Sequence, residues 1–120
     1  MARAIDIQTT QTPRGLVLKI NGDIDGDSAD DLDRQLRIVA ELKPALVVID
    51  LSECAFVASV GMGVLIRFQQ MLAPGGGKVV LAGARPLVRD AFHSAGLEKV
   101  LAIHPTTEDA LKESGKTSVR

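Results

Sequence analysis

The sequence predicts one α/β domain in which a mixed sheet of four or five strands packs with about four helices. Three observations support this prediction. The chain has 120 residues, which is the usual size of a single domain. Two short segments of alternating polarity open the sequence and are separated only by a turn. Apolar runs typical of strands then alternate with segments of helical periodicity, which gives the order β-β-α-β-α-β-α-β-α.

The first two predicted strands form a hairpin. In residues 4–8, Ile5 and Ile7 alternate with polar residues, which indicates a half-buried strand. A Pro-Arg-Gly turn at 13–15 follows, and residues 16–21 then alternate again. We therefore expect these two strands to pair with each other.

A polar, acidic loop leads into the first predicted helix. It covers residues 21–31 (NGDIDGDSADD) and ends where Ser28 can cap a helix with its side chain. Three aspartates are predicted in the first turn, where the helix dipole favours negative charge: Asp30, Asp31 and Asp33. Apolar residues recur at helical spacing until Pro44 ends the helix.

The rest of the chain alternates between strands and helices. The predicted elements are a strand at 45–51, a helix from Val60 to Leu72, a strand at 78–84, a helix from Leu87 to Ala95, a strand at 100–104 and a helix at 107–114. The glycines at 75–77 end the second helix, and Gly96 suits the end of the third. Strands joined through helices imply right-handed parallel crossovers. The domain is thus expected at 4–114, followed by a flexible tail at 115–120.

Composition excludes several classes of function. Aromatic residues make up 2% of the chain and the net charge is −1, which argues against nucleic-acid binding. Cys54 is the only cysteine, so an intramolecular disulfide and a cysteine zinc site are excluded, and we expect it in the core or at its rim. No signal peptide or bilayer-length apolar run is visible. We expect a cytoplasmic protein without direct membrane insertion, metal or cofactor.

No arrangement of residues indicates catalysis. The phosphate-loop pattern fails because Leu72 replaces its first glycine and Val79 replaces its hydroxyl residue. A nucleophile elbow would need glycine where Val57 stands. His93 and His104 are the only candidate histidine bases, and neither has a spacing that points to Ser59, the serine two residues after Val57. An enzyme is therefore not expected.

Ser59 is the only hydroxyl residue in the apolar segment 56–65 (FVASVGMGVL). It stands where a buried strand gives way to a helix, and three interpretations compete. It can cap the helix, act as a nucleophile or be a modification site. A phosphate at this position would place a dianion on the positive end of the helix dipole.

Three segments resemble the bacterial anti-sigma-factor antagonists, which are stand-alone STAS domains. VVIDLSECAFVASVGMGVLIRF (47–68) resembles their central motif of a buried strand followed by F-[IM]-D-S-[ST]-G-[LM]-G-V-L. INGDIDGDSADDL (20–32) is similar to their early acidic loop, and GGKVVLAGARPLVRDAFHSAGLEKVL (76–101) to their third segment. The likeness extends from about Ile5 to Leu111.

The resemblance implies a regulatory function. Such proteins are not enzymes; they bind an anti-sigma factor that is also a serine kinase, and so release a sigma factor for transcription. The kinase switches the antagonist off by phosphorylating one serine, and a PP2C-type phosphatase restores it. Ser59 matches that serine, and Asp25 matches a loop acid near it. The expected partner-binding residues are Asp23, Asp25, Ala58, Val60, Gly61, Met62 and Gly63.

The sequence departs from the family pattern at two positions beside the serine. Ala58 replaces an aspartate and Val60 replaces a serine or threonine, and both changes make the predicted surface more apolar. They favour an alternative hypothesis, a constitutive STAS module without a switch. Such a module would be the scaffold of a signalling complex or an accessory subunit of a lipid or anion transporter. The sequence leaves a homodimer open, and it does not identify the kinase, the sigma factor or the stimulus.

Overall fold

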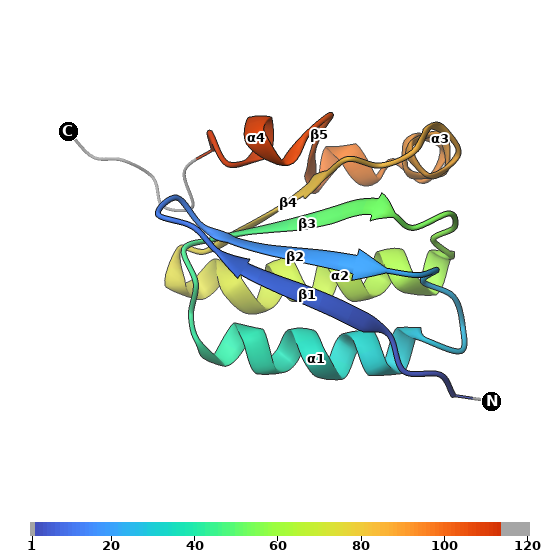
Figure 1. Cartoon of the computed structure of the whole chain (residues 1–120), viewed down its shortest axis with the longest axis horizontal. Coiled ribbons are helices and arrows are strands. Elements are labelled where there is room, and N and C mark those ends of the chain that lie inside the picture. Colours follow the sequence, from blue (N-terminus) through green and yellow to red (C-terminus); the bar gives the residue numbers. More distant parts are fainter. Residues whose placement is uncertain (1, 114–120) are drawn as a thin grey trace.

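A five-stranded mixed sheet forms the centre of the computed structural model, which describes residues 2–113 (Figure 1). Its strands are β1 (Asp6–Gln11), β2 (Leu16–Asn21), β3 (Leu46–Glu53), β4 (Lys78–Ala82) and β5 (Ala102–His104), in this spatial order. β1 and β2 pair antiparallel, and the three following pairs are parallel. The predicted hairpin, crossovers and α/β class are confirmed.

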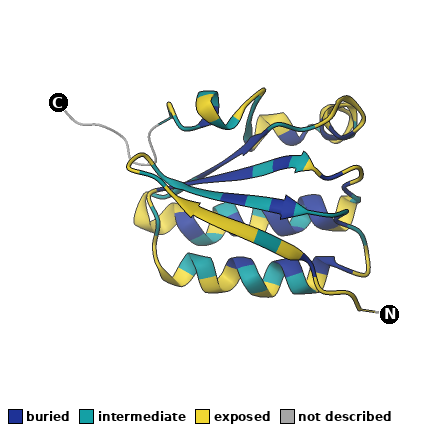
Figure 2. Cartoon of the chain, viewed as in Figure 1, coloured by how far each residue is buried: buried dark blue, intermediate teal, exposed yellow. Residues whose placement is uncertain are grey.

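Helices cover both faces of the sheet. They are α1 (Ala29–Glu41), α2 (Ser59–Leu72), α3 (Pro86–Ala95) and α4 (Thr107–Ala110), with short 3₁₀ turns at Ala73–Gly75 and Leu97–Lys99. In Figure 1, α1 and α2 lie against one face and α4 against the other, while α3 lies near the end of the sheet where β3 finishes. Figure 2 shows the inner sides of α1 and α2 as buried and their outer sides as exposed.

β3 and β4 are buried on both faces, as their continuous apolar sequences predict. The odd residues Val47 and Ile49 point into the larger hydrophobic cluster with α1, α2 and α3. The even residues Leu46 and Val48 join a smaller cluster that Ala110 of α4 closes. This two-sided burial follows from the two-residue period of a strand.

The boundaries of several elements differ from those predicted. β1 covers Asp6–Gln11 rather than 4–8, because pairing with β2 extends it along the partner strand. β5 begins at Ala102, since the 3₁₀ turn that follows Gly96 takes up residues before it. α4 ends at Ala110, before the predicted 114. The tail predicted at 115–120 lies outside the described residues.

Two predictions about the start of α1 are corrected. Ser28 is the N-cap residue, but its side chain makes no capping hydrogen bond. Its Oγ instead donates to the Asp23 carbonyl at 2.9 Å and accepts from the Asp25 N–H at 3.1 Å, so it closes the loop before the helix. Asp33 lies beyond the first turn and pairs with Arg37 at 2.7 Å.

Within residues 2–113, no helix has both the length and the apolar character that crossing a membrane requires.

Candidate functional site

The candidate site lies where the loops that follow β2 and β3 meet. Ile24 and Val57 form a parallel bridge between these loops. The Ile24 N–H donates to the Phe56 carbonyl at 2.9 Å, and the Ala58 N–H donates to the Ile24 carbonyl at 2.7 Å. Ile24 is completely buried, so an apolar anchor holds the two loops together. The acidic loop of residues 23–28 therefore adjoins the start of α2.

Ser59 is the first residue of α2 and is exposed. The N-cap residue is Ala58, whose extended backbone (φ −78°, ψ 163°) precedes the helix. The interpretation of Ser59 as the N-cap is thus wrong, because that role would need the helix to begin at Val60, and α2 begins one residue earlier. No side chain caps α2, and its first turn contains no acidic residue. Ser59 thus lies at a helix N-terminus where no acidic or capping side chain offsets the positive end of the helix dipole.

Exposed apolar side chains flank Ser59. Phe56 is 50% exposed and Val60 is 49% exposed, whereas Met62 is only 7% exposed. Met62 is among the expected partner-binding residues, but its side chain lies in the core, and Phe56 supplies the large exposed apolar surface instead. We call Phe56, Ala58, Ser59 and Val60 the Ser59 patch.

The two glycines of the motif have different surroundings. Gly61 is buried, because α2 approaches Ile24 closely at this point. Gly63 is only partly buried, and an added Cβ would have a single neighbour within 4 Å, at 3.9 Å. Gly61 thus holds the helix against the acidic loop, and Gly63 does not.

A shallow apolar hollow of about 300 Å³ adjoins the Ser59 patch. It lies between the loop before α2 and the side of α3, and its apolar lining is Ala55, Phe56, Val57, Leu87, Val88 and Ala91. Leu87 is 71% exposed at its edge. Phe56 belongs both to the hollow and to the patch, so the exposed apolar surface is continuous.

The aspartates of the acidic loop are engaged in its folding. Asp23 accepts from the Ala55 N–H at 3.0 Å, which ties the loop to the segment after β3. Asp25 accepts from the N–H groups of Asp27 at 3.0 Å and Ser28 at 3.1 Å. Partial burial raises the pKa of Asp25, but these hydrogen bonds and the Arg3 guanidinium outweigh that effect, so its pKa is lower than usual.

Arg3 is a charged residue of the site that sequence reasoning missed. Its guanidinium donates to Asp25 Oδ2 at 2.8 Å and to the Asp23 carbonyl at 3.3 Å. It lies before the first strand and outside the three segments that resemble the family, so no local signal in the sequence identifies it.

The other residues considered for chemistry lie elsewhere. Cys54 is buried, as expected, and burial raises the pKa of its thiol to about 12. His93 is exposed on α3 and pairs with Glu98 at 2.7 Å, whose hydrogen bond raises the pKa of the imidazole. His104 at the end of β5 pairs with Glu113. Each histidine is thus bound to a carboxylate and not to Ser59.

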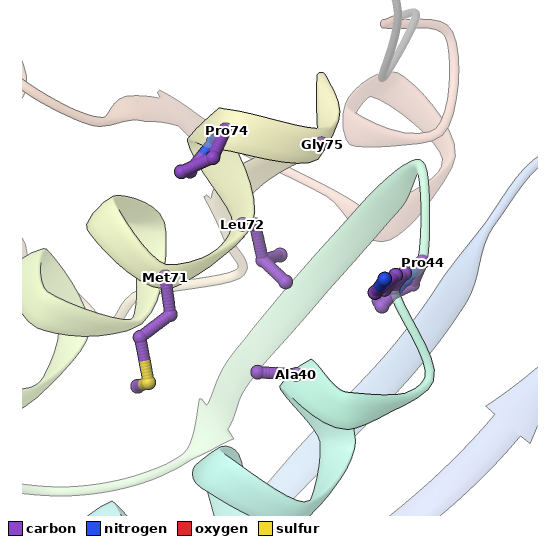
Figure 3. A pocket seen from close by; sticks show the side chains of 7 residues that line it. Ala40, Pro44, Met71, Leu72, Pro74 and Gly75 are labelled. Carbon is purple, nitrogen blue, oxygen red and sulfur yellow. The ribbon is translucent and has the colours of Figure 1, made fainter.

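A second hollow of about 300 Å³ lies at the opposite ends of α1 and α2 (Figure 3). Its lining comprises Ala40, Lys43, Pro44, Met71, Leu72, Pro74 and Gly75. The 14 residues of α2 separate it from Ser59 by about 20 Å. It is therefore not part of the candidate site.

Comparisons with known proteins identify the family. Residues 6–110 match the family model of the STAS domain, and the chain belongs to this family. It is 33% identical over 95 residues to the anti-sigma-F factor antagonist RsfB of Mycobacterium tuberculosis, covering 79% of this chain and 77% of the relative.

Two solved structures illustrate the likeness. The crystal structure of an anti-sigma factor antagonist from Mycobacterium paratuberculosis is 31% identical, with a TM-score of 0.82 over 90% of this chain and 92% of the other. The phosphorylated form of the Bacillus cell fate determinant SpoIIAA shares the fold at 18% identity, with a TM-score of 0.65 over 89% and 97% of the two chains. The chain is thus a STAS protein related to anti-sigma-factor antagonists.

Proposed function

We propose that this protein is an anti-sigma-factor antagonist that phosphorylation of Ser59 switches off. Its partner is an anti-sigma factor with serine-kinase activity, and a PP2C-type phosphatase restores the unmodified form. The observation that carries the proposal is the exposed Ser59 hydroxyl, which lies at an uncapped helix N-terminus within an exposed apolar surface. The relationship to RsfB supports the choice of an anti-sigma factor as partner.

The unmodified protein docks through the Ser59 patch and the adjoining hollow. Phe56 and Val60 each leave about half of the side chain in contact with water. Covering these exposed halves contributes about 1 kcal/mol for each side chain. Asp23 borders this surface at Ala55 and favours a partner with a cationic group there, whereas Arg3 already pairs with Asp25. Apolar contact supplies affinity, and the acidic border supplies orientation.

A phosphate on Ser59 changes the interface without requiring a new fold. It adds about −1.5 to −2 charges at the start of α2. The helix dipole favours an anion there by about 0.3–1 kcal/mol, so the isolated domain tolerates the modification. Burial of the same charge beneath an apolar partner costs several kcal/mol. A penalty of about 3 kcal/mol weakens binding about a hundredfold.

Ala58 and Val60 favour a second candidate function. Ala58 offers no side-chain acceptor at the N-cap, and Val60 offers an exposed apolar group where the family has a hydroxyl. Both residues suit permanent apolar docking, as in a constitutive STAS module of a signalling complex or a transporter. This alternative keeps the same surface and removes the switch.

Phosphopeptide mapping of the protein from its native cells, with and without stress, is the first experiment. The proposal expects phosphate on Ser59 in an amount that depends on growth conditions. Unmodified Ser59 under every condition would select the constitutive module.

Calorimetric titration of the chain with purified anti-sigma-factor kinases of the same organism tests the mechanism. Ser59→Asp is expected to lose about a hundredfold in affinity, whereas Ser59→Ala binds like the original protein. Gln70→Glu, which adds one negative charge to an exposed position near the other end of α2, is the matched control and leaves binding unchanged. Undiminished binding by Ser59→Asp would contradict the proposal.

A further inference from the structure

The segment before β1 is fixed against the acidic loop. The Arg3 N–H donates to the Asp27 carbonyl at 2.7 Å, and the Ile5 N–H donates to Asp31 Oδ2 at 2.9 Å. The Ile5 side chain is 4% exposed and anchors the segment in the core. The backbone of Arg3 is thus held in place, while its side chain is 43% exposed.

The Arg3 guanidinium binds the loop that contacts the segment before α2. It contacts Asp25 Oδ2 and the Asp23 carbonyl, the residues on either side of Ile24. Ile24 itself bridges Val57, and its carbonyl accepts from the Ala58 N–H at 2.7 Å. Asp25 therefore directly follows the residue that contacts Ala58, and the guanidinium bound to Asp25 belongs to the same loop region that meets the start of α2.

We propose that Arg3 is the intramolecular counter-ion of a phosphate on Ser59 and exchanges its contact with Asp25 for the phosphate. This inference rests on the proposed function and assigns a role to a residue outside the family motifs. A dianionic phosphate near the Asp25 carboxylate introduces like-charge repulsion. Movement of the guanidinium onto the phosphate relieves it, because the planar fork of arginine binds two phosphate oxygens at once.

The exchange has a consequence for the modified state. An unpaired phosphoserine has a second pKa of about 6, so part of it is a monoanion at slightly acidic pH. Pairing with Arg3 stabilises the dianion and keeps the full charge on the Ser59 patch. Arg3 is in this sense a positioning residue that increases the difference in charge between the phosphorylated and the unmodified Ser59 patch.

The test uses the full chain with phosphoserine incorporated at position 59 by genetic encoding. The titration of this phosphate is measured by ³¹P NMR as a function of pH. Arg3→Ala is expected to raise the second pKa of the phosphate by about 0.5–1 unit, and Arg3→Lys restores part of the shift. The shift shrinks in high salt. Arg14→Ala removes the same charge from the β1–β2 turn and is the matched control, with no change expected.

Two results would overturn the inference. The first is an Arg3→Ala curve that coincides with that of the phosphorylated parent while circular dichroism shows an intact fold. The second is a shift produced by Arg85→Ala instead, because Arg85 lies at the same end of β3 and donates to the Ser52 carbonyl at 3.0 Å. The measurement needs neither kinase nor partner. Absence of Ser59 phosphate in cells would therefore refute the proposed function without deciding the role of Arg3.

Discussion

Gly61→Ala is expected to destabilise the domain, although alanine is the better helix former. A Cβ at position 61 would lie less than 3.0 Å from Ile24 Cγ2, a distance that real Cβ contacts essentially never show, and 3.3 Å from Val57 Cγ1. Ile24 is completely buried and its clashing methyl is on a branched carbon, so it has little room to rotate. The start of α2 must move away from the acidic loop.

The magnitude follows from two opposing effects. Overpacking of a core costs about 1–3 kcal/mol, and this contact belongs at the upper end. Replacing glycine by alanine within a helix returns about 1 kcal/mol. Gly61→Ala should therefore lower the free energy of unfolding by about 2 kcal/mol, and the melting temperature by about 8 °C.

Gly63→Ala is the matched control in the same helix. An added Cβ there meets only Arg67 Nη1, at 3.9 Å, so the helix-propensity gain is not opposed. We expect this variant to be more stable by up to about 1 kcal/mol. Urea denaturation followed by circular dichroism measures both changes, and their difference isolates the steric cost. Equal stability of the two variants would refute the reasoning.

Two further predictions concern titratable groups. Cys54 should not react with a thiol reagent such as DTNB at neutral pH until the protein unfolds, because burial raises its pKa to about 12; prompt labelling of the native protein would contradict this. A hydrogen bond from the Ile5 N–H, together with Arg34 and Gln35, lowers the pKa of Asp31 from 3.8 to about 2. The contribution of ionised Asp31 to the stability of the fold is complete above pH 4 and is lost as the pH falls through 2. Urea titrations from pH 5 to 2 should show the stability advantage of the original protein over Asp31→Asn shrinking in this window, and a constant difference would disprove the assignment.

Local patterns in the sequence determined the secondary structure and the fold class. The two-sided apolar runs of β3 and β4, the hairpin and the helix stop at Gly96 (φ 72°) follow from periodicity and from the backbone preferences of single residues. Such features depend on neighbours within a few positions, which the sequence displays directly. The family motif likewise predicts a functional role for Ser59 and the acidic loop.

The tertiary structure alone decided how the candidate site is arranged. Met62 is buried and Phe56 exposed because the contact between Gly61 and Ile24 sets the position of α2. Ala58, not Ser59, is the N-cap because the bridge to Ile24 keeps residue 58 extended. Arg3 reaches Asp25 across 22 positions of the chain. The physical reason is that burial and ion pairing depend on distances in space, which a local pattern does not encode.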